Sequence, residues 1–333
     1  MKKVRYGIIG FGGFAEKTIA PAMRLCSNAE LVAIQKRSPE LARQKAGEFN
    51  IPHAFSSAEE LVAHPDVDAV FIVSANGCHH AETLAAAGAG KHVLVEKPMA
   101  LNVRESREMI GACKSANVKL MVGHMIRYST AMRRVRELVR SGSLGTITFA
   151  RADFVYDARL TKRGWLFDRK VAGGGPVFDI GVHCLDTLRF VLDDDVASVK
   201  SHLRPTPTDS ITESTAGISL RFGKGTPGSI YCSFETPVRR SFIEIIGTEG
   251  TVSAYDFTLG ERTITLTIGK RTGESGPAIH NEEIVVPNLY VEEITDFSRA
   301  ILENGEPLIA AVVGLENQRV IDAAMNETDL SRD

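Results

Sequence analysis

The stretch "VRYGIIGFGGFA", residues 4–15, decides the fold of this chain. Its apolar run stops at a glycine, which predicts a buried parallel strand, and a predicted helix starts directly after the glycine-rich turn. Gly10 permits the tight turn, Gly12 lets a pyrophosphate approach the backbone, and Ala15 lets the helix pack closely on the strand. The helix amino terminus would face the phosphates with N–H groups and a positive dipole end. We therefore expect a dinucleotide to contact Gly10, Phe11, Gly12, Gly13, Phe14 and Ala15.

Strand and helix patterns alternate from this turn to about residue 123. "AELVAIQKR", "VDAVFIVSA", "KHVLVEKP" and "VKLMVGH" are apolar, strand-like runs, with helical patterns between them. Such alternation is typical of a doubly wound parallel sheet. After residue 124 strand patterns dominate, among them "TITFARADFVY", "STAGISLRF" and "RTITLTIG". We predict an α/β protein with an N-terminal Rossmann domain, residues 1–123. An α+β domain with an open, largely antiparallel sheet follows in residues 124–333.

Composition narrows the classes of function. Lys plus Arg number 39 and Asp plus Glu number 41, so no global charge attracts nucleic acid or an anionic membrane. There is no run of 18 apolar residues and no signal-peptide pattern. The five cysteines never fall in CxxC spacing, which disfavours a disulfide framework or a zinc site and favours a reducing, cytoplasmic location. We expect no metal site and no nucleic-acid or membrane partner.

The end of the second strand indicates which dinucleotide binds. An NAD site places Asp or Glu about 20 residues after the turn to bind the ribose 2′-hydroxyl. Here "AIQKRS" offers Lys36, Arg37 and Ser38 and no acid. These side chains suit a 2′-phosphate, so we predict NADP, with NAD still possible. Ordinary solvated charges at a strand end are the alternative.

Two further segments carry candidate chemistry. "HVLVEKPMA" places Glu96 and Lys97 at the carboxyl end of a buried strand, where ligands of open α/β sheets bind. "GGGPVFDIGVHCLD", residues 173–186, places Asp179 and His183 four positions apart, on one face of a predicted helix. By itself Lys97 could be a solvated strand end, and the Asp–His pair is as compatible with a buried structural pair as with catalysis.

These motifs together resemble the Gfo/Idh/MocA oxidoreductases. The resemblance rests on "GIIGFGGFA", "AGKHVLVEKP", "GGGPVFDIGVHCLD", "EIIGTEGTV" and "YVEEITDFSRAI", which occur in order over nearly the whole chain. It implies that Lys97 is catalytic, that Asp179 and His183 are the family's Asp-x-x-x-His pair, and that the C-terminal sheet forms subunit contacts. We accordingly expect a homo-oligomer.

The expected reaction is hydride transfer between nicotinamide and a sugar, cyclic polyol or similar small polyhydroxy substrate. His183 would exchange the hydroxyl proton, Lys97 would hydrogen-bond to the reacting oxygen, and Asp179 would orient His183 or bind a neighbouring hydroxyl. Two alternatives remain: an NAD-dependent glycosidase of the same fold and a non-enzymatic dinucleotide sensor.

Further side chains are weaker candidates. Leu166 stands where family members often have the arginine of a Trp-Arg pair. The additional expected cofactor contacts are Ser74, Asn76, His79, Glu96, Lys97 and Trp165. The expected substrate contacts are Lys97, Arg127, Tyr156, Asp179 and His183.

Overall fold

The computed structural model describes residues 2–272, 276–326 and 330. These residues form two compact units. The first contains the chain up to Met125 together with Tyr290–Gln318, and the second contains Ile126–Leu289 and the chain from Arg319. The sequence predicted one division near Gly123 with all of 124–333 in the second domain. Instead, a late segment returns to the first unit.

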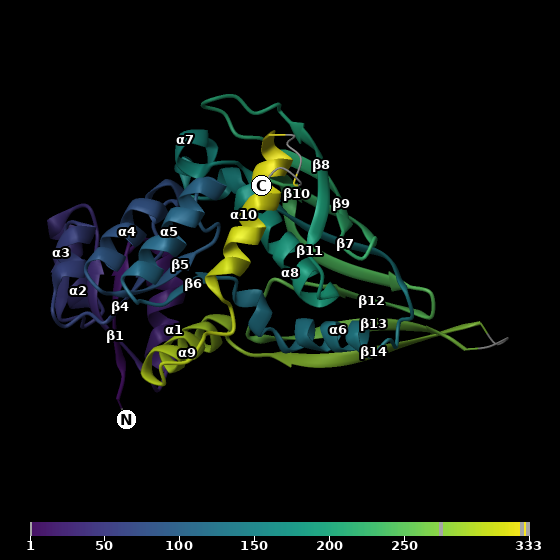
Figure 1. Ribbon diagram of the computed structural model, residues 1–333, viewed down its shortest axis with the longest axis horizontal. Coiled ribbons are helices and arrows are strands. Elements are labelled where there is room, and N and C mark those ends of the chain that lie inside the picture. The colour runs from purple at the N-terminus through teal and green to yellow at the C-terminus, as the bar shows by residue number, and fades with distance from the viewer. Residues whose placement is uncertain (1, 273–275, 327–329, 331–333) are drawn as a thin grey trace. The chain divides into compact units, whose positions relative to one another are not determined.

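Buried bonds account for this return. The Tyr6 hydroxyl lies 2.8 Å from Ser298 Oγ, and the Asn28 side chain donates to the Thr295 carbonyl at 2.9 Å. Both partners lie on helix α9 (Leu289–Leu302), which Figure 1 shows beside α1 (Ala20–Leu25). The apolar positions of α9 are buried, among them Ile294 and Phe297.

The first unit is built on a six-stranded parallel sheet in the order β3-β2-β1-β4-β5-β6. Its strands are β1 (Val4–Ile9), β2 (Ala29–Gln35), β3 (His53–Phe55), β4 (Ala69–Ile72), β5 (His92–Glu96) and β6 (Leu120–Gly123). Every pairing is parallel. The strand order reverses between β1 and β4, and a ligand crevice lies beyond the carboxyl ends at such a switch point.

Helices connect these strands. They are the π-helical turn η1 (Ala15–Ile19), α1, α2 (Pro39–Glu48), α3 (Ala58–Ala63), η2 (Asn76–Cys78), α4 (His79–Gly88), α5 (Val103–Ser115) and η3 (Met125–Tyr128). Helix α10 (Ala311–Asn326) follows α9 near the end of the chain. Side chains of Ser38, Ser57 and Asn102 cap α2, α3 and α5 by accepting backbone N–H bonds, as the residue types at those positions favour. The sequence reading did not identify the short elements β3 and α3.

The second unit is built on an eight-stranded sheet in the order β14-β13-β12-β11-β7-β10-β9-β8. Its strands are β7 (Ile147–Asp157), β8 (Val196–Arg204), β9 (Thr215–Phe222), β10 (Pro227–Ser233), β11 (Glu235–Gly247), β12 (Gly250–Tyr255), β13 (Arg262–Arg271) and β14 (Pro277–Val286). Only the β7–β10 pairing is parallel among the described pairs. The predicted fold class, a parallel Rossmann sheet plus a largely antiparallel sheet, is confirmed.

The helices of this unit are α6 (Thr130–Arg140), η4 (Ala158–Leu160), η5 (Gly164–Phe167), α7 (Arg169–Ala172), η6 (Val177–Gly181) and α8 (Val182–Leu192). Of these, α6, η6 and α8 contact strands of the sheet. Helix α8 is buried along its whole length and packs against β7 and α6. Alternation along β9, where every second residue is buried, shows that the other face of the sheet carries the outward side chains.

Candidate active site

The turn after β1 has the geometry that its glycines predicted. Gly10 has φ +81°, and a Cβ built on it would lie 2.6 Å from the Ser74 Cα, so only glycine fits there. The Gln35 side chain accepts from Gly10 N at 3.0 Å, and the Gln35 carbonyl accepts from Phe11 N at 2.9 Å. The turn is thereby fixed to the carboxyl ends of β2 and β4.

The space beside the turn fits a dinucleotide. A Cβ on Gly12 would meet only the Gly10 carbonyl oxygen, at 3.8 Å, and one on Gly13 would meet no atom of the described residues within 4 Å. Ala15, the first residue of η1, is fully buried and keeps the helix close to the sheet. Open backbone followed by a helix start is the arrangement that binds a pyrophosphate. Lys36, Arg37 and Ser38 stand at the same edge, after β2.

Each of these three residues has a distinct environment. Lys36 Nζ donates to the Phe11 carbonyl at 2.8 Å and lies 3.6 Å from a Glu16 carboxylate oxygen. Arg37 is exposed, and Ser38 Oγ accepts from Leu41 N as the cap of α2. Arg37 is therefore the member of the group whose charge faces solvent.

Ser74, Asn76 and His79 follow β4 at this edge. Ser74 Oγ donates to Glu82 Oε2 at 2.5 Å, and burial raises the pKa of Glu82 to about 7, with the Ser74 bond opposing that shift. Asn76 is buried. The sequence reading missed Glu82, which no motif marks and which reaches Ser74 only because α4 folds back over β4.

His79 supports the loop that carries Lys97. It is enclosed, its Nδ1 lies 2.9 Å from the Pro98 carbonyl, and burial lowers its pKa to about 4. The ring is therefore neutral at pH 7 and donates one N–H to that carbonyl. The contact of His79 with the cofactor stays a prediction, and its contact with the Pro98 carbonyl holds the loop after β5.

Lys97 lies directly after β5, half-buried, and its backbone N–H donates to Glu96 Oε2 at 3.1 Å. The Lys97–Pro98 peptide bond is cis. Nearby on α9, Glu293 is fully buried, and burial raises its pKa, with repulsion from Glu96 adding to the shift. The sequence did not mark Glu293, although "YVEEITDF" contains it, because a glutamate next to another in a helix pattern is usually solvated.

Asp179 is the centre of a polar cluster in the second unit. Its carboxylate accepts from the Tyr156 hydroxyl at 2.7 Å and from two Arg163 nitrogens at 3.1 and 3.2 Å. Arg163 also donates to the Tyr156 hydroxyl at 2.8 Å. Burial and the Asp179 charge raise the pKa of Tyr156, so the phenol keeps its proton and donates. Tyr156 was predicted at this site, and Arg163 was missed.

His183 lies four residues after Asp179, but the intervening turn is π-helical. The wider turn changes the angular relation that an α-helix would give the two side chains. His183 is buried to 9% exposure, and its ring lies 6.3 Å from that of Phe154, centre to centre. Trp165, on η5, is half-buried.

Arg127 has a strong partner within its own unit. Its guanidinium makes a bidentate ion pair with Asp186, with bonds of 2.8–3.0 Å, and lies over the Phe190 ring. The Asp186 side chain is 2% exposed. The substrate contact of Arg127 stays a prediction, and the pair with Asp186 gives Arg127 a packing role as well.

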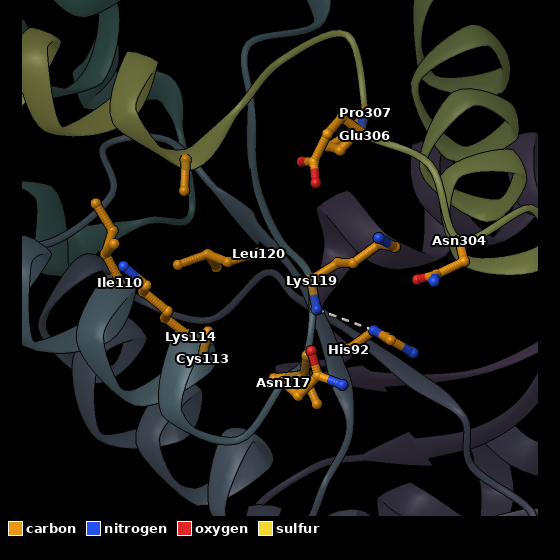
Figure 2. A pocket seen from close by; sticks show the side chains of 12 residues that line it. His92, Ile110, Cys113, Lys114, Asn117, Lys119, Leu120, Asn304, Glu306 and Pro307 are labelled. Atoms are coloured by element: carbon orange, nitrogen blue, oxygen red, sulfur yellow. Dashed lines mark hydrogen bonds between the residues drawn. The ribbon is translucent and has the colours of Figure 1, made fainter.

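The opposite edge of the Rossmann sheet holds a hollow of about 310 Å³, which Figure 2 shows. It lies at the amino ends of β5 and β6, where His92 Nδ1 accepts from Lys119 N at 3.0 Å. The hollow is thus separate from the carboxyl edge that carries Gly10 and Lys97. No helix among the described residues is both long and apolar enough to cross a bilayer.

Two family models match the chain. "Oxidoreductase family, NAD-binding Rossmann fold" covers residues 4–124, and "GFO/IDH/MocA C-terminal domain" covers residues 132–253. A 1,5-anhydro-D-fructose reductase of Ensifer adhaerens is 34% identical over 91% of this chain and 90% of its own length. The chain belongs to the Gfo/Idh/MocA family. It is an NAD(P)-dependent oxidoreductase that acts on CH–OH groups or the corresponding carbonyls.

Other relatives agree with this assignment. A D-xylose 1-dehydrogenase (NADP(+)) of Haloferax volcanii is 28% identical over 96% of this chain and 95% of its own. The crystal structure of an aldose-aldose oxidoreductase from Caulobacter crescentus, complexed with glycerol, superposes with a TM-score of 0.86 at 27% identity. That match covers 100% of this chain and 99% of the other.

Proposed function

We propose that the enzyme transfers a hydride between NADP(H) and a sugar, cyclic polyol or related hydroxyl–carbonyl pair. The observation that carries this proposal is Lys97, fixed after β5 at the same sheet edge as the dinucleotide turn. The names of the relatives support the substrate class, because they include a reductase of an anhydro-sugar and a dehydrogenase of xylose.

The preference for NADP is proposed from the end of β2. Lys36 and exposed Arg37 offer positive charge where an NAD site offers a carboxylate. An ionised phosphate and a guanidinium form charge-assisted, bidentate hydrogen bonds. The bound nicotinamide supplies hydride transfer at C4.

The protein's own groups would then manage the proton and the oxygen. In the proposed roles, Lys97 donates a hydrogen bond to the reacting oxygen, and His183 takes or gives the hydroxyl proton. Tyr156 and Arg163 orient Asp179, which in this proposal binds His183 or a neighbouring substrate hydroxyl.

Turnover of a sugar and inositol panel with NADP(H) and NAD(H) tests this proposal. Lys97→Ala is expected to lower kcat about 10²–10⁴-fold while NADP binding persists, because general acid–base and oxyanion contributions are of that order. Lys97→Ala and His183→Ala together should cost much less than the product of the single losses, since groups acting on one step are non-additive. Near-normal turnover of Lys97→Ala would reject the assignment.

Arg37→Ala tests the cofactor preference. Because Arg37 is exposed and its loss disturbs no packing, we expect a tenfold or greater fall in the NADP-to-NAD ratio of kcat/KM, about 1.4 kcal/mol or more of lost phosphate binding. Arg43→Ala on α2 is the matched control for charge. Equal losses for both dinucleotides would contradict the role of Arg37.

We also propose that the outward face of the eight-stranded sheet pairs with a second copy of the chain. Directly paired residues share a face, and the register places Tyr231, Asp153, Phe242 and Tyr255 in one row across four strands. Tyr231 and Tyr255 are 40% and 62% exposed, and Ile279 on β14 is 71% exposed.

The five cysteines, all described and all free thiols, support the proposal of a reducing, cytoplasmic location.

A further inference from the structure

Two histidines and an aspartate meet at the amino edge of the Rossmann sheet, away from the dinucleotide turn. His53 is the first residue of β3, His64 caps the end of α3, and Asp66 lies in the loop before β4. One potential ligand atom from each residue lies within 4.8 Å of the other two. The proposed reaction uses none of these residues. We propose that they form a zinc site.

The distances approach those of a metal coordination sphere. His53 Nε2 lies 3.3 Å and His64 Nδ1 lies 4.0 Å from Asp66 Oδ2, and the imidazole centroids are 4.1 Å apart. Bonds to zinc of about 2.0–2.2 Å place neighbouring ligand atoms of a tetrahedron about 3.3–3.6 Å apart. The His53–Asp66 distance already fits, and the His64–Asp66 distance exceeds this range by about 0.4 Å.

The surroundings orient the ligands. Arg5 Nη1 donates to Asp66 Oδ1 at 2.9 Å, so the other carboxylate oxygen turns toward the imidazoles. The Asp66 N–H donates to His64 Nδ1 at 3.3 Å, so zinc would bind that nitrogen in place of this hydrogen bond. Outer contacts such as the Arg5–Asp66 bond set the direction of metal ligands.

The exposure of the three side chains suits a divalent cation that enters from solvent. Asp66 and Asp68 both pair with Arg5, and Lys91 Nζ donates to the His64 carbonyl at 3.2 Å, so two carboxylates face two cations and zinc binding depends on the three ligand atoms. The side chains of His53, His64 and Asp66 are 30%, 24% and 51% exposed, which leaves a fourth position for water. Two imidazoles and one carboxylate favour zinc over calcium or magnesium, which prefer oxygen ligands.

A zinc ion here would join the edge strand β3 to the α3–β4 connection. Strand β1 spans about 20 Å at 3.3 Å per residue, so the ion would lie far from Gly10, which follows the carboxyl end of β1. We therefore expect zinc to stabilise the first unit and to leave the reaction unchanged. This site departs from the expectation of no metal, because no sequence spacing marks ligands brought together by a strand and a loop.

Equilibrium dialysis of tag-free, EDTA-treated protein against ZnCl2 tests the proposal. We expect one zinc per chain in the wild type and a loss of affinity of tenfold or more in His53→Ala and in His64→Ala. The matched control is His80→Ala, which removes a histidine that is 23% exposed, similar to His64, and that pairs with Glu108 at 2.8 Å. The control should bind zinc as the wild type does.

A second set of measurements distinguishes loss of a zinc ligand from misfolding of a variant. Wild-type protein titrated with CoCl2 should develop the intense visible absorption of a four-coordinate nitrogen–oxygen site, and ZnCl2 should abolish it. Zinc should also raise the melting temperature of the wild type and of His80→Ala, and not that of His53→Ala. Absence of zinc binding by the wild type, or equal binding by all variants, would leave only a His–Asp ion pair and overturn the proposal.

Discussion

Individual glycines in the turn after β1 have different tasks, and substitution separates them. Gly10 has a positive φ and presses on Ser74, whereas Gly12 has open space beside it. We predict that Gly10→Ala lowers stability by about 1–3 kcal/mol, from an unfavourable backbone conformation and the clash. Gly12→Ala should melt as the wild type does and yet bind dinucleotide at least tenfold more weakly, because the methyl group occupies the phosphate position.

Thermal melts and dinucleotide titration of both variants check this pair. Equal stability losses would mean that Gly12 is also a structural glycine. Unchanged binding by Gly12→Ala would mean that the phosphates lie elsewhere.

Glu82 makes the stability of the folded protein depend on pH. Burial raises its pKa to about 7, so the folded protein holds this proton at pH values where the unfolded chain, with a pKa near 4.5, releases it. The contribution to stability is thus fully present below about pH 4.5, falls as the pH rises toward 7 and then levels off. We predict that Glu82→Gln removes this loss and raises stability at pH 8 by about 1–3 kcal/mol.

Urea unfolding at several pH values measures this effect, with exposed Glu40→Gln on α2 as the control. If the free energy of unfolding changes equally with pH between 5 and 7 in the wild type and in Glu82→Gln, the raised pKa of Glu82 is contradicted.

At the scale of elements, the Arg127–Asp186 pair joins η3 to α8. Breaking a buried ion pair leaves an uncompensated charge, which costs about 3–5 kcal/mol. We predict that loss for Arg127→Met, because Asp186 is almost fully enclosed. Arg127→Met with Asp186→Leu should recover a large part of it, since two apolar side chains leave no charge behind.

Denaturant unfolding of the single and double variants measures the recovery. The kinetics of the double variant also separate the packing role from the predicted substrate contact. If the double variant is stable and has a normal KM, Arg127 does not contact the substrate.

Within the residues that the structure describes, two helices contain a wide π turn. Pro21 lacks an N–H and its ring crowds the carbonyl four residues earlier, so η1 precedes α1 where a regular helix would clash. In η6, a Cβ on Gly181 would lie 3.2 Å from Cys232 Sγ, and glycine lets the wide turn pack on β10. The helix prediction for both segments was correct, and the one-face relation of Asp179 and His183 stays a prediction.

At the scale of the whole molecule, the exposed side chains on the outward face of the eight-stranded sheet predict an oligomer. We expect an oligomer by sedimentation or light scattering, and a shift toward monomer in Tyr231→Lys combined with Tyr255→Lys, because two charges in an apolar contact must be desolvated. Val238→Lys, an exposed apolar position outside that row of paired residues, is the control. A wild-type monomer would contradict the proposed pairing.

The sequence by itself determined the local features of this protein. The strand–glycine–helix pattern at 4–15, the Ser38 cap, the long helices and the alternating strands follow from backbone and hydrophobic rules that act within about ten residues. The carboxyl-edge position of Lys97 follows in the same way from the end of β5.

Contacts between distant segments were decided only by the tertiary structure. The return of α9 to the Rossmann unit, the Glu82 bond to Ser74, the hold of Arg163 on Asp179 and the His53–His64–Asp66 cluster each join residues that no shared period connects. Their energies depend on burial and on the direction of side chains across separate elements, and these quantities exist only once the chain is packed.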